Sequence, residues 1–352
     1  MKSINSDNIR KFDSMLSSAE NIVIVTHMKP DGDAIGSSMG LYHTLKLYGK
    51  QAKVAVADPV PSSIGFLVEG NNDILVHETM KEDAEKAILN SDLMICLDFN
   101  SFHRTDTLQH TLERSEAQKV LIDHHLFPDT ERFQLVFSET EVSSASELLF
   151  HILMELPVIG GNAGHLPEEA ALALMTGMTT DTNNFMNSTY PSTLRMASSL
   201  LEAGVDRDYI IRNVYNSFKE ERIRLQGHML KDLMTITPDG VAYMVLDRKT
   251  MTRYNVEEGD TEGFVNIPLS IGKVVMSVFA KEDEDRIRIS VRSRKGVSAN
   301  RCARLHFNGG GHENAAGGRL FMPQDVAGID EAARYIEEHT HIFMTEENER
   351  IS

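Results

Sequence analysis

Acidic and histidine side chains gather directly after the first apolar run of the chain. The run IVIVT (22–26) is followed by His27, Asp31 and Asp33. Carboxylates this close together, if left without a positive partner, would have raised pKa values and would destabilise the fold. Carboxylate and imidazole groups are also good ligands for divalent metal ions. The segment therefore predicts a bound cation.

The same residue types recur further along the chain. They are Asp98 after DLMICLD (92–98), Asp123, His124 and His125 in KVLIDHH (119–125), and Asp181 in TGMTTDTNNF. A single Asp after a strand is more often a helix cap or turn residue, and a single His is more often a hydrogen-bonded group than a ligand. Their coincidence at several strand ends favours a shared metal site.

Four apolar runs predict the strands that bring these residues together. The runs alternate with segments of helical pattern, which predicts a parallel α/β sheet covered on both faces. Ligands of such sheets bind beyond the carboxyl ends of the strands, where the Asp and His residues stand. The predicted strands are 22–26, 52–57, 92–98 and 119–125, and the predicted helices are 34–48, 81–90 and 106–118.

The ligand chemistry narrows the choice of metal. Mixed carboxylate and imidazole ligation without a nearby thiolate suits Mn²⁺ best, with Fe²⁺, Co²⁺ or Zn²⁺ as alternatives. The ligands are too many for one ion and indicate a two-metal site with a separation of ~3.5–4 Å, the usual arrangement for phosphoester hydrolysis. Gly32, Gly36 and Ser37 fit beside it, because the helix from Ala34 would point its N–H groups at an anion.

In the second half of the chain, a helical stretch is followed by strand-like sequence patterns, which indicates a second domain. We expect a first domain at 1–205, a helical linker at 206–230 and a second domain at 231–345, followed by a frayed tail. The second domain is expected to contain a hairpin that turns at Pro238-Asp239-Gly240. The remaining predicted elements are helices at 143–155, 167–179, 191–203 and 207–231, strands at 234–247, 272–281 and 285–293, and helices at 298–306 and 325–339.

Arginines and glycines stand out in the second domain. In DRIRISVRSRK, Arg286, Arg288, Arg292 and Arg294 alternate with apolar residues, so they share one face of a strand. Some of them belong to a solvated face opposite KEDED (281–285), but four exceed what solubility requires, and at least one is available for an anion. The segment NGGGHENAAGG (308–318) is either a flexible loop or a close-approach loop around a ligand.

Composition excludes several classes of protein. The 352 residues are 41% hydrophobic and 25% charged, as in ordinary globular proteins, and no apolar run is long enough to span a membrane. A net charge of −17 argues against a surface that grips long duplex nucleic acid. We expect a cytoplasmic protein whose cysteines, Cys96 and Cys302, are buried thiols.

The segments HMKPDGDAIGS, CLDFN, IDHH and TTDTNNF resemble those of the DHH phosphoesterase family, named for the triplet at 123–125. The resemblance implies catalytic roles for Asp98, for Asp123 as the residue that orients an imidazole, and for His125 near the reacting water or phosphate. It also implies two metal ions that share Asp98. One would be held by His27, Asp31 and Asp98, the other by Asp33, Asp98, His124 and Asp181.

The segments VRSR and GGGHENAAGG resemble the DHHA1 domain, which follows the catalytic domain in this family. The resemblance implies a smaller α/β substrate-binding domain and an active site in the cleft between the two domains. Two residues depart from the family pattern: Glu313, where Lys is more usual, and Asn183, where Gly is common. The implied pocket for a distal phosphate or nucleotide consists of Arg292, Ser293, Gly310, Gly311, His312 and Asn314.

The combined prediction is a phosphohydrolase with two Mn²⁺ ions, or other divalent ions. The domain order implies a nanoRNase-like enzyme that cleaves short oligonucleotides, adenosine 3′,5′-bisphosphate or both. The alternatives are hydrolysis of cyclic di-AMP or linear pApA, hydrolysis of polyphosphate or pyrophosphate, and a catalytically silent nucleotide-binding module. The expected partner is a short oligonucleotide or nucleotide phosphoester, with no long duplex and no membrane, and a homodimer remains open.

Overall fold

The computed structural model describes residues 4–257 and 259–351, and it divides into two compact units between Ser217 and Phe218. This division lies inside the segment 206–230, for which the sequence predicts a helical linker. Each unit has a hydrophobic core of its own.

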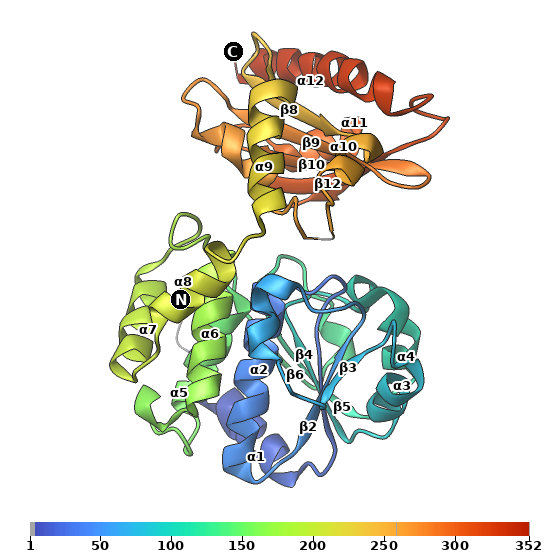
Figure 1. Ribbon diagram of the computed structural model, residues 1–352. Coiled ribbons are helices and arrows are strands. Elements are labelled where there is room, and N and C mark those ends of the chain that lie inside the picture. Colours follow the sequence, from blue (N-terminus) through green and yellow to red (C-terminus); the bar gives the residue numbers. More distant parts are fainter. Residues whose placement is uncertain (1–3, 258, 352) are drawn as a thin grey trace. The chain divides into compact units, whose positions relative to one another are not determined.

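The first unit is built on a six-stranded sheet in which every pairing is parallel (Figure 1). The predicted parallel α/β fold is thereby confirmed. The order β3-β2-β1-β4-β5-β6 places two short, partly exposed strands at the edges, and the sequence did not predict these two. The strands are β1 (Ile22–Val25), β2 (Ala52–Val56), β3 (Ile74–Val76), β4 (Leu93–Leu97), β5 (Gln118–Asp123) and β6 (Leu135–Ser138).

Helices cover both faces of this sheet, which explains why its central strands are apolar on both sides. Ile22 and Ile24 of β1 belong to the core on the side of α2, whereas Val23 and Val25 pack on the side of α3 and α4 (Figure 1). The helices are α1 (Ser6–Ser18), α2 (Gly32–Leu45), α3 (Lys81–Leu89), α4 (Gln109–Arg114), α5 (Ala145–Glu155), α6 (Glu168–Asp181), α7 (Pro191–Glu202) and α8 (Arg207–Tyr215).

Glycines allow α2 and α6 to pack closely against each other. A Cβ atom on Gly36 would lie 2.6 Å from the carbonyl oxygen of Ala173 and 2.7 Å from the backbone nitrogen of Gly177. A Cβ atom on Gly32 would collide with the Thr180 side chain. Gly32 and Gly36 therefore allow α2 to pack closely on α6, a role that the sequence did not predict.

The second unit contains a mixed six-stranded sheet in the order β11-β12-β10-β9-β8-β7, with α12 packed against β8 and β9 (Figure 1). The predicted hairpin at Pro238-Asp239-Gly240 joins β7 to β8. The elements are α9 (Glu220–His228), β7 (Thr235–Ile236), β8 (Val241–Leu246), α10 (Arg248–Arg253), β9 (Met276–Glu282), β10 (Arg286–Ser293), α11 (Ala299–His306), β11 (Gly310–Gly311), β12 (Ala315–Phe321) and α12 (Ile329–Ile351).

Several element boundaries differ from the sequence predictions. The segment predicted as a helix at 106–118 begins as a 3₁₀ helix, kinks at Asp106, where φ is 47°, and ends at Arg114. The helical stretch predicted at 207–231 is interrupted between α8 and α9. Helix α12 continues beyond the expected frayed end, and there Arg301 of α11 pairs with Glu346 and Glu347.

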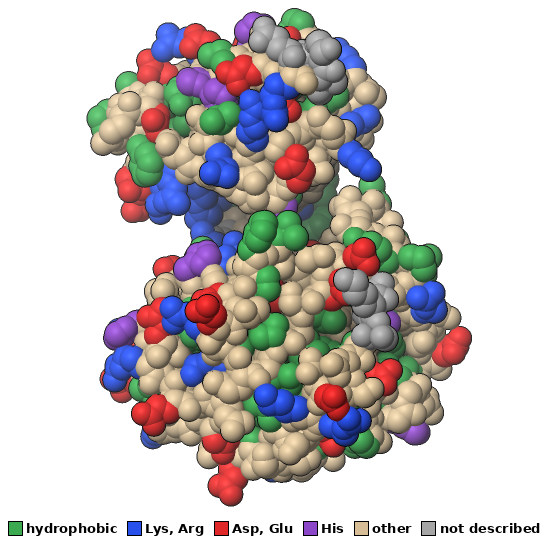
Figure 2. Space-filling model, turned by 180° about the vertical axis from the view of Figure 1, so that it is seen from behind, with side chains coloured by type: hydrophobic (Ala, Val, Ile, Leu, Met, Phe, Trp, Pro, Cys, Tyr) green, Lys and Arg blue, Asp and Glu red, His purple; other side chains and the backbone are tan. Residues whose placement is uncertain are grey.

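Surface and core agree with the composition. Cys96 and Cys302 are buried and unpaired, as predicted. Among the described residues, no helix combines the length and apolar character needed to cross a membrane. On the face shown in Figure 2, charged side chains of both signs occur on each unit, several Lys and Arg side chains lie together at one edge of the second unit, and hydrophobic side chains occur singly or in small groups.

Candidate metal centre

The Asp and His residues lie where the strand order of the first sheet reverses. β1 pairs with β2 on one side and with β4 on the other, so the connections leave β1 and β4 in opposite directions. Such a switch point leaves a crevice beyond the carboxyl ends of the strands. His27 follows β1, and Asp98 directly follows β4 in a left-handed backbone conformation with φ of 63°. The chain thus leaves the sheet at Asp98.

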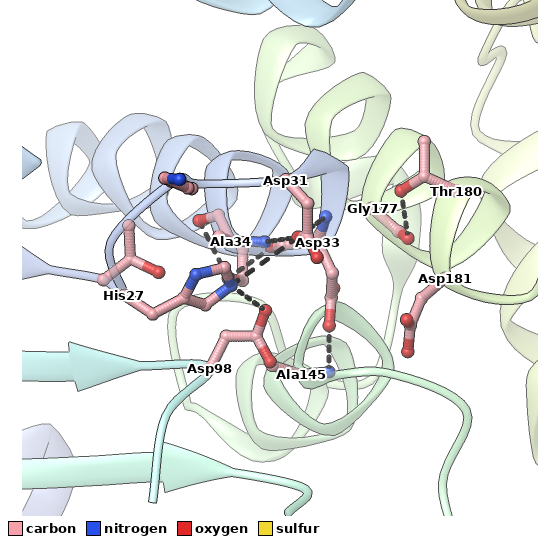
Figure 3. Close-up of polar contacts among 12 residues, drawn as sticks. His27, Asp31, Asp33, Ala34, Asp98, Ala145, Gly177, Thr180 and Asp181 are labelled. Atoms are coloured by element: carbon pink, nitrogen blue, oxygen red, sulfur yellow. Dashed lines mark hydrogen bonds and ion pairs between the residues drawn. The ribbon is translucent and has the colours of Figure 1, made fainter. Parts of the chain in front are cut away.

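One group that could hold a metal ion consists of His27, Asp31 and Asp98 (Figure 3). The His27 Nε2 atom lies 3.5 Å from Oδ2 of Asp98 and 3.8 Å from Oδ1 of Asp31. The other ring nitrogen, Nδ1, lies 2.8 Å from the carbonyl oxygen of Met28. Because a carbonyl only accepts, Nδ1 carries a proton, and Nε2 is the nitrogen that can bind a metal.

A second group consists of Asp33, His124 and Asp181, and its ligand atoms lie within 4.8 Å of one another. The Nε2 atom of His124 is 3.7 Å from Oδ2 of Asp181 and 4.0 Å from Oδ2 of Asp33. The same nitrogen lies 3.4 Å from Oδ1 of Asp98. Asp98 therefore faces His27 with one oxygen and His124 with the other.

Within the triplet at 123–125, a hydrogen bond joins Asp123 to His125. Asp123 is fully buried, and its Oδ1 atom lies 2.8 Å from Nδ1 of His125. His125 also belongs to a third possible ligand group, with Asp98 and His124. A carboxylate behind an imidazole fixes the orientation and the tautomer of the ring.

Asp31 also caps a helix. One of its carboxylate oxygens accepts hydrogen bonds from the backbone N–H groups of Asp33 and Ala34, both at 3.0 Å, at the start of α2. These two N–H groups are therefore occupied by the cap, which corrects the expectation that they face a phosphate. The cap also holds Asp31 beside His27.

Asp33 is fixed by a helix that the sequence analysis did not connect with the site. Its two carboxylate oxygens accept hydrogen bonds from Ala145 N at 2.6 Å and Ser146 N at 2.9 Å, at the start of α5 (Figure 3). The pattern Ser144-x-x-Glu147 is a capping-box signature, and it could have marked the start of this helix.

The electrostatics of the site fit a cation. Burial raises the pKa of Asp33 to about 7, and the neighbouring Asp98 adds to this shift. Burial also raises the pKa of Asp181, with a further contribution from Asp33. For His27 burial lowers the pKa, but Asp98 and Asp31 outweigh it and raise the value to about 9. Protons thus stabilise a cluster whose carboxylates repel one another.

Among the described residues, the aspartates of this cluster have no Lys or Arg partner to balance their charge. In the described part of the chain, no Lys or Arg forms an ion pair with the five aspartates of the site, and Oδ1 of Asp98 and Oδ2 of Asp123 are buried without a hydrogen-bond partner. The donor set is carboxylate and imidazole, with no thiolate. These residues could therefore hold divalent metal ions. The five aspartates are Asp31, Asp33, Asp98, Asp123 and Asp181.

The arginine strand of the second unit has the predicted alternation, because Ile287, Ile289 and Val291 of β10 are buried. Arg286 and Arg288 pair with acidic residues at 283–285, as expected for a solvated face. The guanidinium group of Arg294 donates to backbone carbonyl groups.

Arg292 differs from these three arginines. It forms no ion pair among the described residues and donates only to the carbonyl groups of Val291, at 3.0 Å, and Ala316, at 3.3 Å. Burial lowers the pKa of its guanidinium group. Arg292 is therefore the arginine of this strand that is best placed to bind an anion.

The glycine run is an ordered hairpin and not a flexible loop. Gly310 and Gly311 form β11 and pair with Gly317 and Ala316 of β12, with the turn at His312–Ala315. The side chain of Asn314 donates to Ser293 Oγ at 3.0 Å and also to the carbonyl groups of Arg294 and Val297. Asn314 and Ser293 are thus brought together, and they fasten the turn to the end of β10.

Two known domain families match the two units of the chain. The N-terminal domain of the DHH family matches residues 21–178, and the DHHA1 domain matches residues 239–338. A probable bifunctional oligoribonuclease and PAP phosphatase NrnA from Streptococcus mutans is 30% identical over 308 residues, which cover 86% of this chain and 90% of that protein. The chain belongs to the DHH family.

Two further relatives match this chain over 85% and 99% of its length. The bifunctional oligoribonuclease and PAP phosphatase NrnA from Thermus thermophilus is 32% identical over 307 residues, which cover 85% of this chain and 84% of that enzyme. The crystal structure of an exopolyphosphatase-related protein from Bacteroides fragilis is 37% identical, with a TM-score of 0.91 and 99% of both chains covered. As a DHH family member, the chain is a hydrolase acting on phosphoester bonds.

Proposed function

We propose that this DHH family member uses two Mn²⁺ ions to hydrolyse short oligoribonucleotides and adenosine 3′,5′-bisphosphate. The observation that carries the proposal is the position of Asp98 between two ligand groups, His27 with Asp31 and His124 with Asp33 and Asp181. When bound there, divalent ions would polarise phosphoryl oxygens and lower the pKa of a water molecule. The names of two relatives, each an oligoribonuclease and PAP phosphatase, support the substrates.

The residues around the ions have separate roles in this proposal. Asp98 would contact both ions, and Asp123 orients His125 through the hydrogen bond to Nδ1. His125 would transfer a proton at the reacting phosphate through its Nε2 atom. In the second unit, Arg292 would bind a phosphate group of the substrate, because its guanidinium group forms no ion pair in the described chain and donates only to two carbonyl groups.

Polyphosphate is a second candidate substrate, because the Bacteroides fragilis relative is described as exopolyphosphatase-related. A substrate panel with Mn²⁺ separates the candidates. It contains 5′-labelled ribonucleotides of increasing length from the dinucleotide, adenosine 3′,5′-bisphosphate, cyclic di-AMP, linear pApA, polyphosphate and pyrophosphate. We expect the fastest turnover with the shortest ribonucleotides and with the bisphosphate. Turnover of polyphosphate or pyrophosphate alone would contradict the proposal, and nucleotide binding without any hydrolysis would indicate a silent module.

A further inference from the structure

Glu147 is a fully buried carboxylate that belongs to none of the possible ligand groups. It lies in the first turn of α5. Its Oε2 atom accepts hydrogen bonds from Ser143 N at 2.9 Å, Ser143 Oγ at 2.5 Å and Thr193 Oγ1 at 2.6 Å, and its Oε1 atom lies 3.5 Å from Nε2 of His151. Thr193 belongs to α7. A single carboxylate thus joins the start of α5 to a second helix.

The contacts of Glu147 hold the N-terminus of α5 in one conformation. Ser144 Oγ accepts a hydrogen bond from Glu147 N at 2.9 Å, and Glu147 in turn accepts from the N–H group of Ser143. This reciprocal cap leaves two other N–H groups of the first turn, those of Ala145 and Ser146, directed at Asp33.

Asp33 depends on this helix start for its orientation. Both of its oxygens are engaged by α5, and its side chain is almost completely buried, with 1% of the residue exposed. Gly177 of α6 leaves no spare room, because a Cβ atom there would lie 3.0 Å from Asp33 Oδ1 and 2.0 Å from Ser146 Oγ. A small displacement of α5 would therefore turn Asp33 away from His124 and Asp181.

We infer that Glu147 is a positioning residue for the second metal ion. It fixes the N-terminus of α5, and the N–H groups of Ala145 and Ser146 then orient Asp33 as a ligand beside His124 and Asp181. The inference rests on the proposed function, because it requires an ion at that group.

Mn²⁺ titration of the purified metal-free protein tests this inference, with calorimetry for affinity and electron paramagnetic resonance for the coupling between ions. The variants His27→Ala and Asp181→Ala first show which binding constant belongs to which ligand group. In Glu147→Ala, we expect the second ion to bind about tenfold to a hundredfold more weakly, as is usual when a group that orients a ligand is removed. The first ion should keep its affinity within about twofold, and the spin coupling should be lost.

Two further variants separate orientation from general stability. Glu147→Gln keeps an acceptor oxygen for Ser143 and Thr193, so it should restore the second ion to near wild-type affinity. Leu200 is a buried core residue of α7. Leu200→Ala should therefore lower the melting temperature while both ions remain bound. If Glu147→Ala does not fold, Thr193→Val provides the test, because it removes one hydrogen bond to Glu147 and should weaken the second ion alone.

The possible outcomes distinguish two kinds of failure. Wild-type protein that binds fewer than two Mn²⁺ ions would overturn the proposed function, and this inference with it. Two ions in the wild type with unchanged affinities in Glu147→Ala would overturn only the role of Glu147. An equal loss of the second ion in Leu200→Ala would do the same, since it would reflect general destabilisation.

Discussion

Asp98 faces both halves of the candidate metal centre with one carboxylate. Its two oxygens lie 3.5 Å from His27 Nε2 and 3.4 Å from His124 Nε2. Burial by itself would raise the pKa of Asp98, but the two imidazoles hold it well below its usual range. The side chain therefore stays ionised although it is buried, as a ligand shared by two cations must.

Replacement of Asp98 should affect metal binding and catalysis together. We predict that Asp98→Ala lowers kcat at least about a hundredfold and removes at least one Mn²⁺ ion per chain, since a ligand common to both ions is lost. Activity assays and metal analysis of the same purified sample check both effects. Activity close to that of the wild type in a folded Asp98→Ala protein would contradict the shared-ligand assignment.

Proton binding at the site predicts how pH acts on the metal-free protein. The pKa of His27 is about 9 against an ordinary 6.5, and that of Asp33 is about 7 against 3.8. A raised pKa means that the folded state binds the proton more tightly, so this stabilisation is complete below the ordinary pKa and is lost as the pH rises through the folded value. The loss extends over pH 3.8–7 for Asp33 and over pH 6.5–9 for His27.

A metal ion bound by these side chains would take the place of the protons and would restore the lost stability. We therefore predict that Mn²⁺ raises the melting temperature more at about pH 8.5 than at about pH 6, by several degrees. Thermal unfolding with and without Mn²⁺, under nitrogen, measures the difference. An equal or larger rise at the lower pH would argue against displacement of protons by the metal.

The side chains of the candidate centre could be predicted from the sequence, but the hydrogen bonds that orient them could not. Asp and His after apolar runs carry a clear pattern, and the structure brings His27, Asp31, Asp98 and His124 together. The hydrogen bonds from α5 to Asp33 come from backbone N–H groups, which every residue except proline has. Such contacts do not depend on which residues are present, so they can be seen only in the structure.

At the scale of elements, the site depends on how closely α2 packs against α6. Asp33 lies in the first turn of α2 and Asp181 is the last residue of α6, so the approach of the two helices sets the distance between two ligands. Each of the two helices could be predicted from the sequence, but the packing of α2 against α6 could not. It depends on where small residues of each helix meet, and segments far apart in the sequence determine that.

A methyl group at Gly36 should separate the two helices. We predict that Gly36→Ala lowers the free energy of unfolding by about 1–3 kcal/mol, because its Cβ atom would meet the backbone of α6 at 2.6 Å. Gly65→Ala is the matched control, since no atom lies within 4 Å of the added Cβ. Denaturant titration compares the free energies of unfolding of the two variants. Equal values would show that α6 can shift to accommodate the methyl group without loss of stability.

In the second unit, Arg292 of β10 is the residue that we propose to bind a phosphate group of the substrate. We predict that Arg292→Ala raises KM about tenfold or more with a smaller change in kcat, because a charged hydrogen bond to phosphate is lost. Arg288→Ala, on the same face of β10 but paired with Asp283 at 3.1 Å, should leave KM unchanged. A similar KM for all three proteins would exclude Arg292 as the phosphate-binding residue.

The edges of both sheets were harder to predict than their centres. β3 and β6 have three and four residues and are partly exposed, whereas the four residues of the central strand β1 are all buried. In the second unit, the hairpin of β11 and β12 is rich in glycine, which predicts a loop by composition. In the structure β12 pairs with both β11 and β10, and the backbone N–H group of Ala299 in α11 donates to the carbonyl group of Glu313 in the turn.

At the scale of the whole molecule, the chain combines a unit that carries a candidate metal centre with a second unit that carries a candidate anion-binding arginine. Its net charge of −17 argues against a surface that grips long duplex nucleic acid. Each unit has its own hydrophobic core, so damage to one need not unfold the other.

Diffraction at the manganese absorption edge tests the two-metal site most directly. In crystals grown with Mn²⁺, we predict two anomalous peaks per chain, ~3.5–4 Å apart, one beside His27 and Asp31 and one beside His124 and Asp181, with Asp98 between them. A single peak, or peaks away from these residues, would contradict the dinuclear site.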